Sequence, residues 1–290
     1  MTRSAVRGAG VAATIAVIAA LLNGCGGSRP ADTAHSSVSS PVPTAAPSSS
    51  VDARAGLVDI GGGRHLFAEC AGRGTPTILL ESGDESDTQQ WRLVYPALIE
   101  HTRTCRYDRL GNGQSDDATG CRELPDLRAD LETLLRALGE DGPYVLVGTS
   151  GGGYLMAGFA YAHPAATLGM VLVETPHAII ASQSPPELLA ELKCDSPTNQ
   201  EHRDYVRVEN AAWSQRHQIG DIPMTIISNN YRGDYQNEEE RTNVAGQKGW
   251  LVLSPQARQI VVTTGHNVPE DQPELVTQEI LRVIDGARAH

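Results

Sequence analysis

The stretch "VLVGTSGGGYLMAG", residues 145–158, constrains the fold of this chain more than any other part of its sequence. Apolar residues typical of a buried strand run directly into "GTSGGG", and a helical pattern follows. Three adjacent glycines at such a point cost conformational entropy, which indicates a geometric reason for them. A sharp reversal from a strand into a helix, with the serine at its tip, is such a reason.

Ser150 lies in a Gly-x-Ser-x-Gly pattern formed with Gly148 and Gly152. Between a strand and a helix this pattern is typical of a nucleophile elbow. There the serine backbone is strained, and side chains two residues away on either side would collide. The serine also lies at a helix N-terminus, where free N–H groups favour a developing negative charge. The pattern predicts Ser150 as a nucleophile; the alternative is a glycine-rich turn with an idle serine.

Short apolar runs alternate with amphipathic stretches along the rest of the chain. Several runs are almost unbroken, as in strands covered on both faces. A helical pattern of leucines begins near Pro125 and stops at Gly139, and another runs from Pro273 to Ile284. This alternation predicts an α/β fold, a mostly parallel sheet with helices on both faces. The candidate strands are Leu57–Ile60, Arg64–Cys70, Thr77–Glu81, Thr102–Asp108, Tyr144–Gly148, Gly169–Glu174, Met224–Ser228 and Gln259–Thr263.

The N-terminus is typical of a bacterial lipoprotein. Residues 1–24 read as a signal peptide, because Arg3 and Arg7 precede a short apolar run. The letters "LNGC" at 22–25 resemble a lipobox, in which the cysteine, here Cys25, receives lipid; the alternative is an ordinary signal peptide. We expect residues 25–52, rich in Ser, Pro and Ala, to form a disordered tether to a domain of residues 53–290. The predicted location is the outer face of the bacterial cell membrane.

Charge and cysteine content narrow the function classes. The net charge of −12 argues against nucleic acid and against electrostatic docking on anionic lipid. Cys70, Cys105, Cys121 and Cys194 follow the tether, and an even count in an exported chain predicts two disulfides, with three pairings open. None of them has the spacing of a zinc pair, so we predict no metal site. Catalysis by a serine nucleophile needs no organic cofactor, so we predict none.

A serine nucleophile needs a histidine base that a carboxylate orients, and in this architecture the expected order is Ser, acid, His. His266 follows the apolar run "QIVVTTG" on a loop before the final helix. A loop histidine at the carboxyl edge of a sheet can reach the serine of an elbow. We therefore interpret His266 as the base; the alternative is an exposed loop histidine.

Three segments together resemble the α/β-hydrolase family over essentially all of residues 55–288. "CRYDRLGNGQSD" at 105–116 is similar to the strand-4 segment of that family, "PYVLVGTSGGG" to its elbow, and "GHNVPEDQPELV" to its catalytic-histidine loop. The resemblance implies an eight-stranded sheet and a serine hydrolase, and says almost nothing about the substrate. We interpret Asp108 and Arg109 as an ion pair or a loop brace beside the site rather than as catalytic groups.

This chain departs from the family at the oxyanion segment, where many members carry His-Gly after the third strand and this chain carries Ser82-Gly83. The donors of an oxyanion hole are backbone N–H groups, and the resemblance implies those of Asp84 and Gly151. A carboxylate pointing into the site would disfavour an oxyanion. We therefore expect the side chains of Asp84 and Glu85 to turn away.

The carboxylate that would orient the histidine is a second departure from the family. Family members usually place it a few residues past strand 7, where this chain has no carboxylate until Asp234. Some relatives place it after strand 6, where Glu174 stands. A buried glutamate at a strand tip needs a partner, and His266 would serve, so we favour Glu174. Glu174 could instead pair with Arg109, and Asp234 could be plain surface charge.

The family also implies a cap insertion between strands 6 and 7, here about residues 176–221. In its usual sheet order strands 2 and 4 are neighbours, so Cys70 would pair with Cys105 and leave Cys121 for Cys194 in the cap.

The leading functional prediction is a monomeric, lipid-anchored serine esterase or related acyl hydrolase that acts on a small-molecule ester. A peptidase, a thioesterase or a cofactor-free haloperoxidase could use the same residues. A non-catalytic binding lipoprotein that has kept the fold is an alternative from another class.

Overall fold

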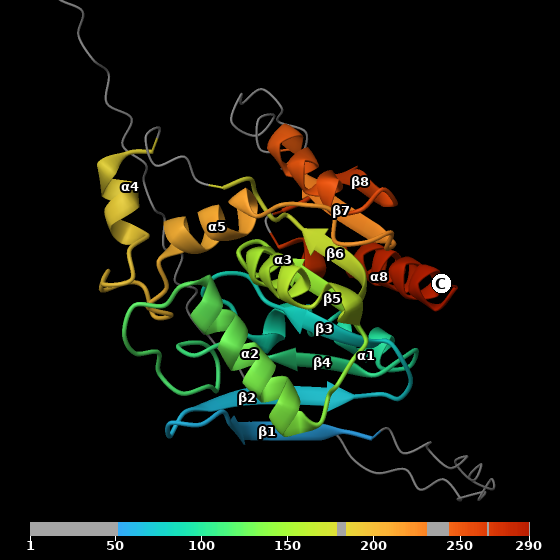
Figure 1. Ribbon diagram of the computed structural model, residues 1–290, viewed down its shortest axis with the longest axis horizontal. Coiled ribbons are helices and arrows are strands. Elements are labelled where there is room, and N and C mark those ends of the chain that lie inside the picture. Colours follow the sequence, from blue (N-terminus) through green and yellow to red (C-terminus); the bar gives the residue numbers. More distant parts are fainter. Residues whose placement is uncertain (1–51, 179–183, 231–243, 266, 290) are drawn as a thin grey trace, which may run out of the picture. The chain divides into compact units, whose positions relative to one another are not determined.

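The computed structural model of the protein describes residues 52–178, 184–230, 244–265 and 267–289 (Figure 1). The predicted signal peptide, Cys25 and nearly all of the predicted tether lie outside these residues, as do Asp234 and His266. Among the described residues, no helix combines the length and the apolar character needed to span a bilayer.

Strands from the described residues form one eight-stranded sheet in the order β1-β2-β4-β3-β5-β6-β7-β8. β1 pairs antiparallel with β2 and β2 with β4, whereas the remaining pairs are parallel. This sheet confirms the predicted α/β fold, and every candidate strand overlaps one of its members. The strands are β1 Arg54–Asp59, β2 His65–Ala71, β3 Thr77–Glu81, β4 Thr104–Tyr107, β5 Tyr144–Thr149, β6 Thr167–Val173, β7 Met224–Asn229 and β8 Ala257–Val262.

Burial follows the position of each strand in the sheet. Every residue of β3, β5 and β7 is buried, which explains their unbroken apolar sequences. β1 and β8 form the two edges and keep exposed residues, including Leu57 and Val261. The predicted bounds of β1 and β8 differ from the observed ones by up to three residues, because an edge strand lacks the burial pattern that defines its ends.

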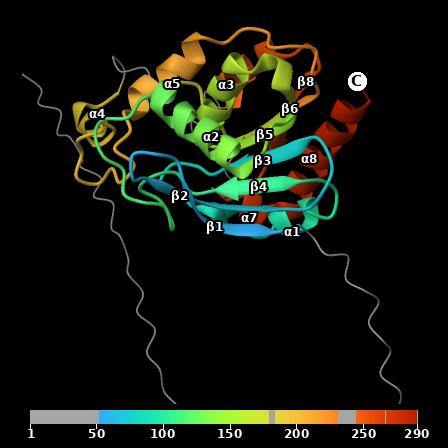
Figure 2. The same ribbon diagram turned by 60° about the horizontal axis from the view of Figure 1, so that its bottom comes forward.

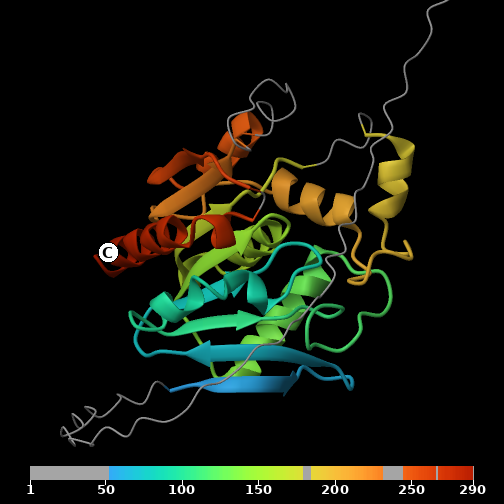
Figure 3. The same ribbon diagram turned by 180° about the vertical axis from the view of Figure 1, so that it is seen from behind.

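Helices cover both faces of the sheet. α2, α3 and α5 lie on one face, and α1, α7 and α8 on the other (Figures 2 and 3). One apolar core includes Leu131 and Met156 on the first face, and a second core includes Leu98 and Ile280 on the opposite face. The helices are η1 Thr88–Trp91, α1 Tyr95–Leu98, α2 Leu124–Leu138, α3 Gly152–Ala162, η2 Pro164–Ala166, α4 Pro186–Glu191, α5 Tyr205–Ser214, η5 Lys248–Leu253, α7 Val268–Asp271 and α8 Pro273–Arg288.

Local sequence determines where α2 begins and ends. Glu123 and Asp126 form a capping box at its start, with Pro125 in the first turn. Gly139 ends the helix in the left-handed conformation, which costs glycine less than other residues. The predicted start and stop of this helix are therefore confirmed to within one residue.

Two disulfides join segments that are distant in the sequence. Cys70 and Cys105 face each other across β2 and β4 with their Cα atoms 4.1 Å apart. Cys121 is bonded to Cys194, which lies in the connection between β6 and β7. This is the pairing implied by the family's sheet order. The second disulfide ties the β6–β7 connection, which contains α4 and α5, to the segment just before α2.

Peptide mapping of the non-reduced protein is expected to find Cys70 linked to Cys105 and Cys121 linked to Cys194. Replacing Cys121 and Cys194 together with serine is expected to lower the free energy of unfolding by about 2–4 kcal/mol, because the unfolded chain is then released from a long closed loop. Urea unfolding of the oxidised protein and of the double variant measures this difference. A peptide that joins Cys70 to Cys121 or Cys194 would contradict the pairing.

Candidate functional site

Ser150 lies at the sharp turn between β5 and α3. Its φ of 48° is in the left-handed region, which is sterically costly for serine. A Cβ on Gly148 would lie 2.7 Å from the Gly153 Cα, and a Cβ on Gly152 would overlap the Ser82 carbonyl oxygen. The turn therefore has the backbone strain and the close approaches that the Gly-x-Ser-x-Gly pattern predicts.

Glu174 occupies the corresponding place on the neighbouring strand. Thr149 of β5 is in register with Val173 of β6, so Ser150 and Glu174 are the next residues along two paired parallel strands. Glu174 also has a left-handed backbone, with φ of 51°, and its side chain is buried. The two residues are thus side by side at the carboxyl edge of the sheet. This is where ligands bind in open α/β sheets.

The residues on either side of His266 are attached to the same edge. Asn229, the last residue of β7, donates from Nδ2 to the Gly265 carbonyl at 2.6 Å. Gln90 donates from Nε2 to Asn267 Oδ1 at 3.4 Å. His266 itself, like Asp234, lies outside the described residues.

The loop after β3, residues 82–85, lies close to the serine. A Cβ added to Gly83 would lie 3.3 Å from the Ser150 Cβ. The Gly83 N–H donates to Gln90 Oε1 at 2.8 Å, so Gln90 joins this loop to Asn267. Two residues further on, the Glu85 N–H donates to Glu201 Oε1 at 2.8 Å.

The Asp84 N–H, between these two bonded groups, has no acceptor among the described residues. The Gly151 N–H, directly after Ser150, likewise has no acceptor within the described part of the chain. These are the two groups that the family resemblance implies as oxyanion donors. Two free N–H groups beside a serine can stabilise a negatively charged oxygen that forms there.

Arg109 binds the loop after β3 through its guanidinium. Its guanidinium donates to both carboxylate oxygens of Glu201, from Nε at 2.8 Å and from Nη2 at 2.7 Å. Nη1 donates to Glu81 and to the Ser82 carbonyl, and Nη2 donates to the Gly83 carbonyl; both carbonyl bonds are 2.7 Å long. Arg109 is therefore the loop brace that the sequence predicts.

Asp108 connects two other segments. Its carboxylate accepts from the Thr88 N–H at 2.7 Å and from the Gln114 N–H at 2.9 Å. Through these bonds Asp108 ties η1 to the glycine-rich segment after β4.

The charges in this cluster have shifted pKa values. Burial alone would raise the pKa of Glu201, but Arg109, followed by Arg203, outweighs burial and lowers that pKa to about 2. Burial dominates at Glu81 and raises its pKa, because Arg109 and the Tyr107 hydroxyl offset only part of the cost. Burial would likewise lower the pKa of Arg109, but Glu201 and Glu81 hold it well above its ordinary value.

The Asp84 carboxylate lies beside the serine turn on the Gly151 side. A Cβ on Gly151 would overlap its carboxylate, so this carboxylate lies directly against the residue that follows Ser150. Arg203 Nη1 lies 2.5 Å from Asp84 Oδ1. Arg203 thus places a positive charge next to the Asp84 carboxylate.

Sequence reasoning missed three members of the cluster. Glu81 is a charged residue at the end of the otherwise apolar strand "TILLE", which is a usable signal. Glu201 and Arg203 lie in a polar stretch that reads as solvent-exposed, yet their side chains are each 1% exposed. No local pattern marks them, because their burial depends on partners from distant segments.

Groups with metal-ligand chemistry in the described part of the chain are Cys70 and Cys105 near Glu140, and Cys121 and Cys194 near Asp204. All four cysteines are disulfide-bonded, and a metal binds the thiolate rather than the disulfide. Neither group is therefore a metal centre.

Comparisons with known proteins agree with this geometry. Residues 76–221 match the model of the alpha/beta hydrolase fold family. A curated relative, the uncharacterized protein YqjL of Bacillus subtilis, is 23% identical over 210 residues, which cover 69% of this chain and 80% of the relative.

Solved structures share the fold at low identity. A thermophilic esterase from Thermogutta terrifontis is 19% identical with a TM-score of 0.60, covering 81% of this chain and 99% of its own. The carboxylesterase CesB from Bacillus subtilis is 17% identical with a TM-score of 0.58, covering 82% and 93%. On its family match and its sheet order, this chain belongs to the alpha/beta hydrolase fold family.

Proposed function

We propose that this chain is a serine hydrolase that cleaves a carboxylic ester or a related acyl bond. The observation that carries the proposal is the strained turn that presents Ser150 beside the N–H groups of Asp84 and Gly151, both free among the described residues. The fold shared with proteins named an esterase and a carboxylesterase supports an ester as the substrate class.

In the proposed reaction the Ser150 hydroxyl attacks the carbonyl carbon, and His266 takes the hydroxyl proton. His266 then passes that proton to the leaving alcohol, which departs as the acyl-enzyme forms. A water molecule, activated by His266 in the same way, releases the acid and restores the serine. The scheme needs no metal and no organic cofactor.

The proposed oxyanion hole consists of backbone groups alone. The N–H groups of Asp84 and Gly151 would donate to the carbonyl oxygen as it becomes negatively charged. Gly151 is also the N-cap residue of α3, so the positive end of the helix dipole favours the same charge.

Replacing Ser150 or His266 with alanine is expected to abolish turnover of a p-nitrophenyl ester, because each change removes a reacting group. The Ser150→Ala variant is also expected to lose labelling by a fluorophosphonate probe, which reacts with activated serines. Thermal melts of both variants serve as the control for folding. Wild-type protein that neither turns over esters of graded chain length nor labels with the probe would favour a non-catalytic binding protein.

We propose Glu174 as the carboxylate that orients His266, with Asp234 as the alternative. The support for Glu174 is its buried position next to Ser150 at the carboxyl edge of the sheet. A carboxylate in this role fixes the imidazole tautomer and stabilises the imidazolium.

Glu174→Gln is expected to lower turnover at least about a hundredfold, since the amide keeps the shape but loses both effects. Asp234→Asn is the matched variant and is expected to stay within about threefold of wild type. Steady-state rates with accompanying thermal melts test both. A crippled Asp234→Asn beside a near-normal Glu174→Gln would place the acid after β7.

We further propose that the protein is exported and held at the outer face of the cell membrane by lipid on Cys25. Wild-type protein is expected to partition into detergent, and Cys25→Ala into the aqueous phase, because acyl chains supply the membrane affinity. Detergent partitioning of cells that express each form measures this. Equal membrane association of both forms after signal cleavage would contradict a lipid on Cys25.

A further inference from the structure

Arg203 is a buried arginine that reaches the serine turn from the β6–β7 connection. Its Nη1 lies 2.5 Å from Asp84 Oδ1, and its Nη2 donates to the Gly151 carbonyl at 3.5 Å. Nη1 also lies 3.7 Å from Glu201 Oε2, and the guanidinium stands 4.8 Å from the centre of the Tyr205 ring. Arg203 thus contacts both residues whose N–H groups form the proposed oxyanion hole.

The carboxylate of Asp84 poses an electrostatic problem at this position. It lies against Gly151, so an oxyanion held by the Gly151 N–H would form close to it. Two negative charges a few ångströms apart in a desolvated site repel each other strongly. The site therefore needs a positively charged group next to the Asp84 carboxylate.

We propose that Arg203 is a positioning residue of the oxyanion hole. It holds the Asp84 carboxylate against Gly151 and cancels its charge, so that the N–H groups of Asp84 and Gly151 can stabilise the oxyanion. This inference rests on the proposed serine hydrolase function.

The other arginine of the cluster is already occupied. The guanidinium of Arg109 donates to Glu81, to Glu201 and to two loop carbonyls. Among the described residues, Arg203 is the cation that makes an ion pair with Asp84.

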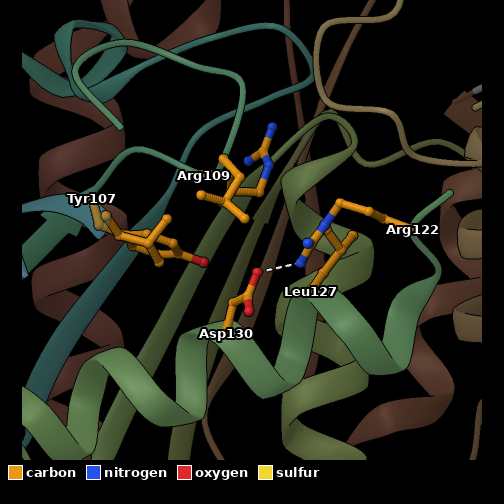
Figure 4. Close-up of a pocket in the computed structure, with 7 residues that line it drawn as sticks. Tyr107, Arg109, Arg122, Leu127 and Asp130 are labelled. Carbon is orange, nitrogen blue, oxygen red and sulfur yellow. Dashed lines mark hydrogen bonds and ion pairs between the residues drawn. The ribbon is translucent and has the colours of Figure 1, made fainter. Parts of the chain in front are cut away.

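The backbone of Arg203 is fixed by the segment before α2. The Arg122 N–H donates to the His202 carbonyl at 2.8 Å, and the Asp204 N–H donates to the Arg122 carbonyl at 2.9 Å. The Arg122 side chain in turn pairs with Asp130 of α2 (Figure 4). Arg203 is therefore held from both sides, as a positioning residue must be.

A small cavity lies beside Arg109. Figure 4 shows Tyr107, Arg122 and Asp130 around it, and its volume is about 10 Å³. That volume suits about one water molecule and excludes a substrate. The space under Arg109 thus belongs to the scaffold rather than to the substrate pocket.

Several charged and titratable groups face Asp84. Burial raises its pKa, Arg203 and Arg109 act to lower it, and Glu201 acts to raise it further. Burial raises the pKa of the Tyr154 and Tyr205 hydroxyls, and the nearby charge of Asp84 raises both further. Removal of Arg203 would therefore raise the pKa of Asp84 further and take away the positive charge nearest to its ionised form.

The test is a double-mutant cycle on p-nitrophenyl ester hydrolysis with Arg203→Met, Asp84→Asn and their combination. Arg203→Met is expected to lower kcat about a hundredfold near pH 8, with KM within about threefold, because the lost interaction is made in the transition state. In the Asp84→Asn background the same change is expected to cost less than about tenfold, because no carboxylate is left to neutralise. Arg207→Met, on the exposed face of α5, is the control and is expected to stay within about twofold.

The pH profile separates this role from a merely structural one. Below its pKa Asp84 is neutral and needs no compensation; above it the ionised carboxylate repels the oxyanion. The ratio of kcat for Arg203→Met to kcat for wild type is therefore expected to fall as pH rises through the pKa of Asp84 in the variant. A ratio that does not change with pH would overturn the proposal.

Arg203→Met is expected to be less stable than wild type, since breaking a buried ion pair leaves one charge unpaired. The comparison of Asp84→Asn with Asp84→Asn/Arg203→Met tests the proposal even if Arg203→Met does not fold. Neither of these two variants contains the Asp84 carboxylate, so loss of Arg203 leaves no unpaired charge on residue 84. A hundredfold loss between these two folded variants would overturn the proposal. Active wild type with an unaffected Arg203→Met refutes this inference alone, whereas wild type without turnover or probe labelling refutes the proposed function and this inference with it.

Discussion

Arg109 lies at the centre of the interactions that shape this molecule's carboxyl edge. A buried guanidinium is costly unless each of its donors is satisfied, and here two carboxylates and two backbone carbonyls accept from it. Those acceptors come from the end of β3, from the loop that follows it and from the β6–β7 connection. Because one planar group binds all three, the loop after β3 and the connection cannot move independently. The arrangement of the serine turn depends on this constraint.

The strain at the site is supported by the parallel sheet. Ser150 and Glu174 both have left-handed backbones, and each donates its N–H to the next strand, to the carbonyls of Val173 and Ile227 respectively. The sheet hydrogen-bonding pattern therefore continues one residue beyond β5 and β6. That continuation holds two conformations that neither residue would adopt alone. Strain of this kind places two polar side chains at fixed positions on adjacent strands.

Sequence reasoning succeeded where the determinants are local. Thr77–Glu81 is predicted to the residue because it is a fully buried strand, and the turn at Ser150 because its sterics involve residues close in the chain. It failed for Glu201 and Arg203, since Glu201 owes its burial to Arg109, a residue 92 positions away. The position of the Asp84 carboxylate likewise depends on a residue distant in the sequence. Its carboxylate lies against Gly151 and makes an ion pair with Arg203 from the β6–β7 connection.

The loop after β3 shows how backbone donors can be organised without the imidazole that many relatives carry there. Arg109 binds the carbonyls of Ser82 and Gly83, while Gln90 and Glu201 accept the N–H groups of Gly83 and Glu85. With its neighbours bound on both sides, the Asp84 peptide has little freedom to reorient. Donors that need no reorganisation stabilise a developing charge best. Since Glu201 belongs to the β6–β7 connection, that connection is part of the structure that holds the loop around the Asp84 N–H in place.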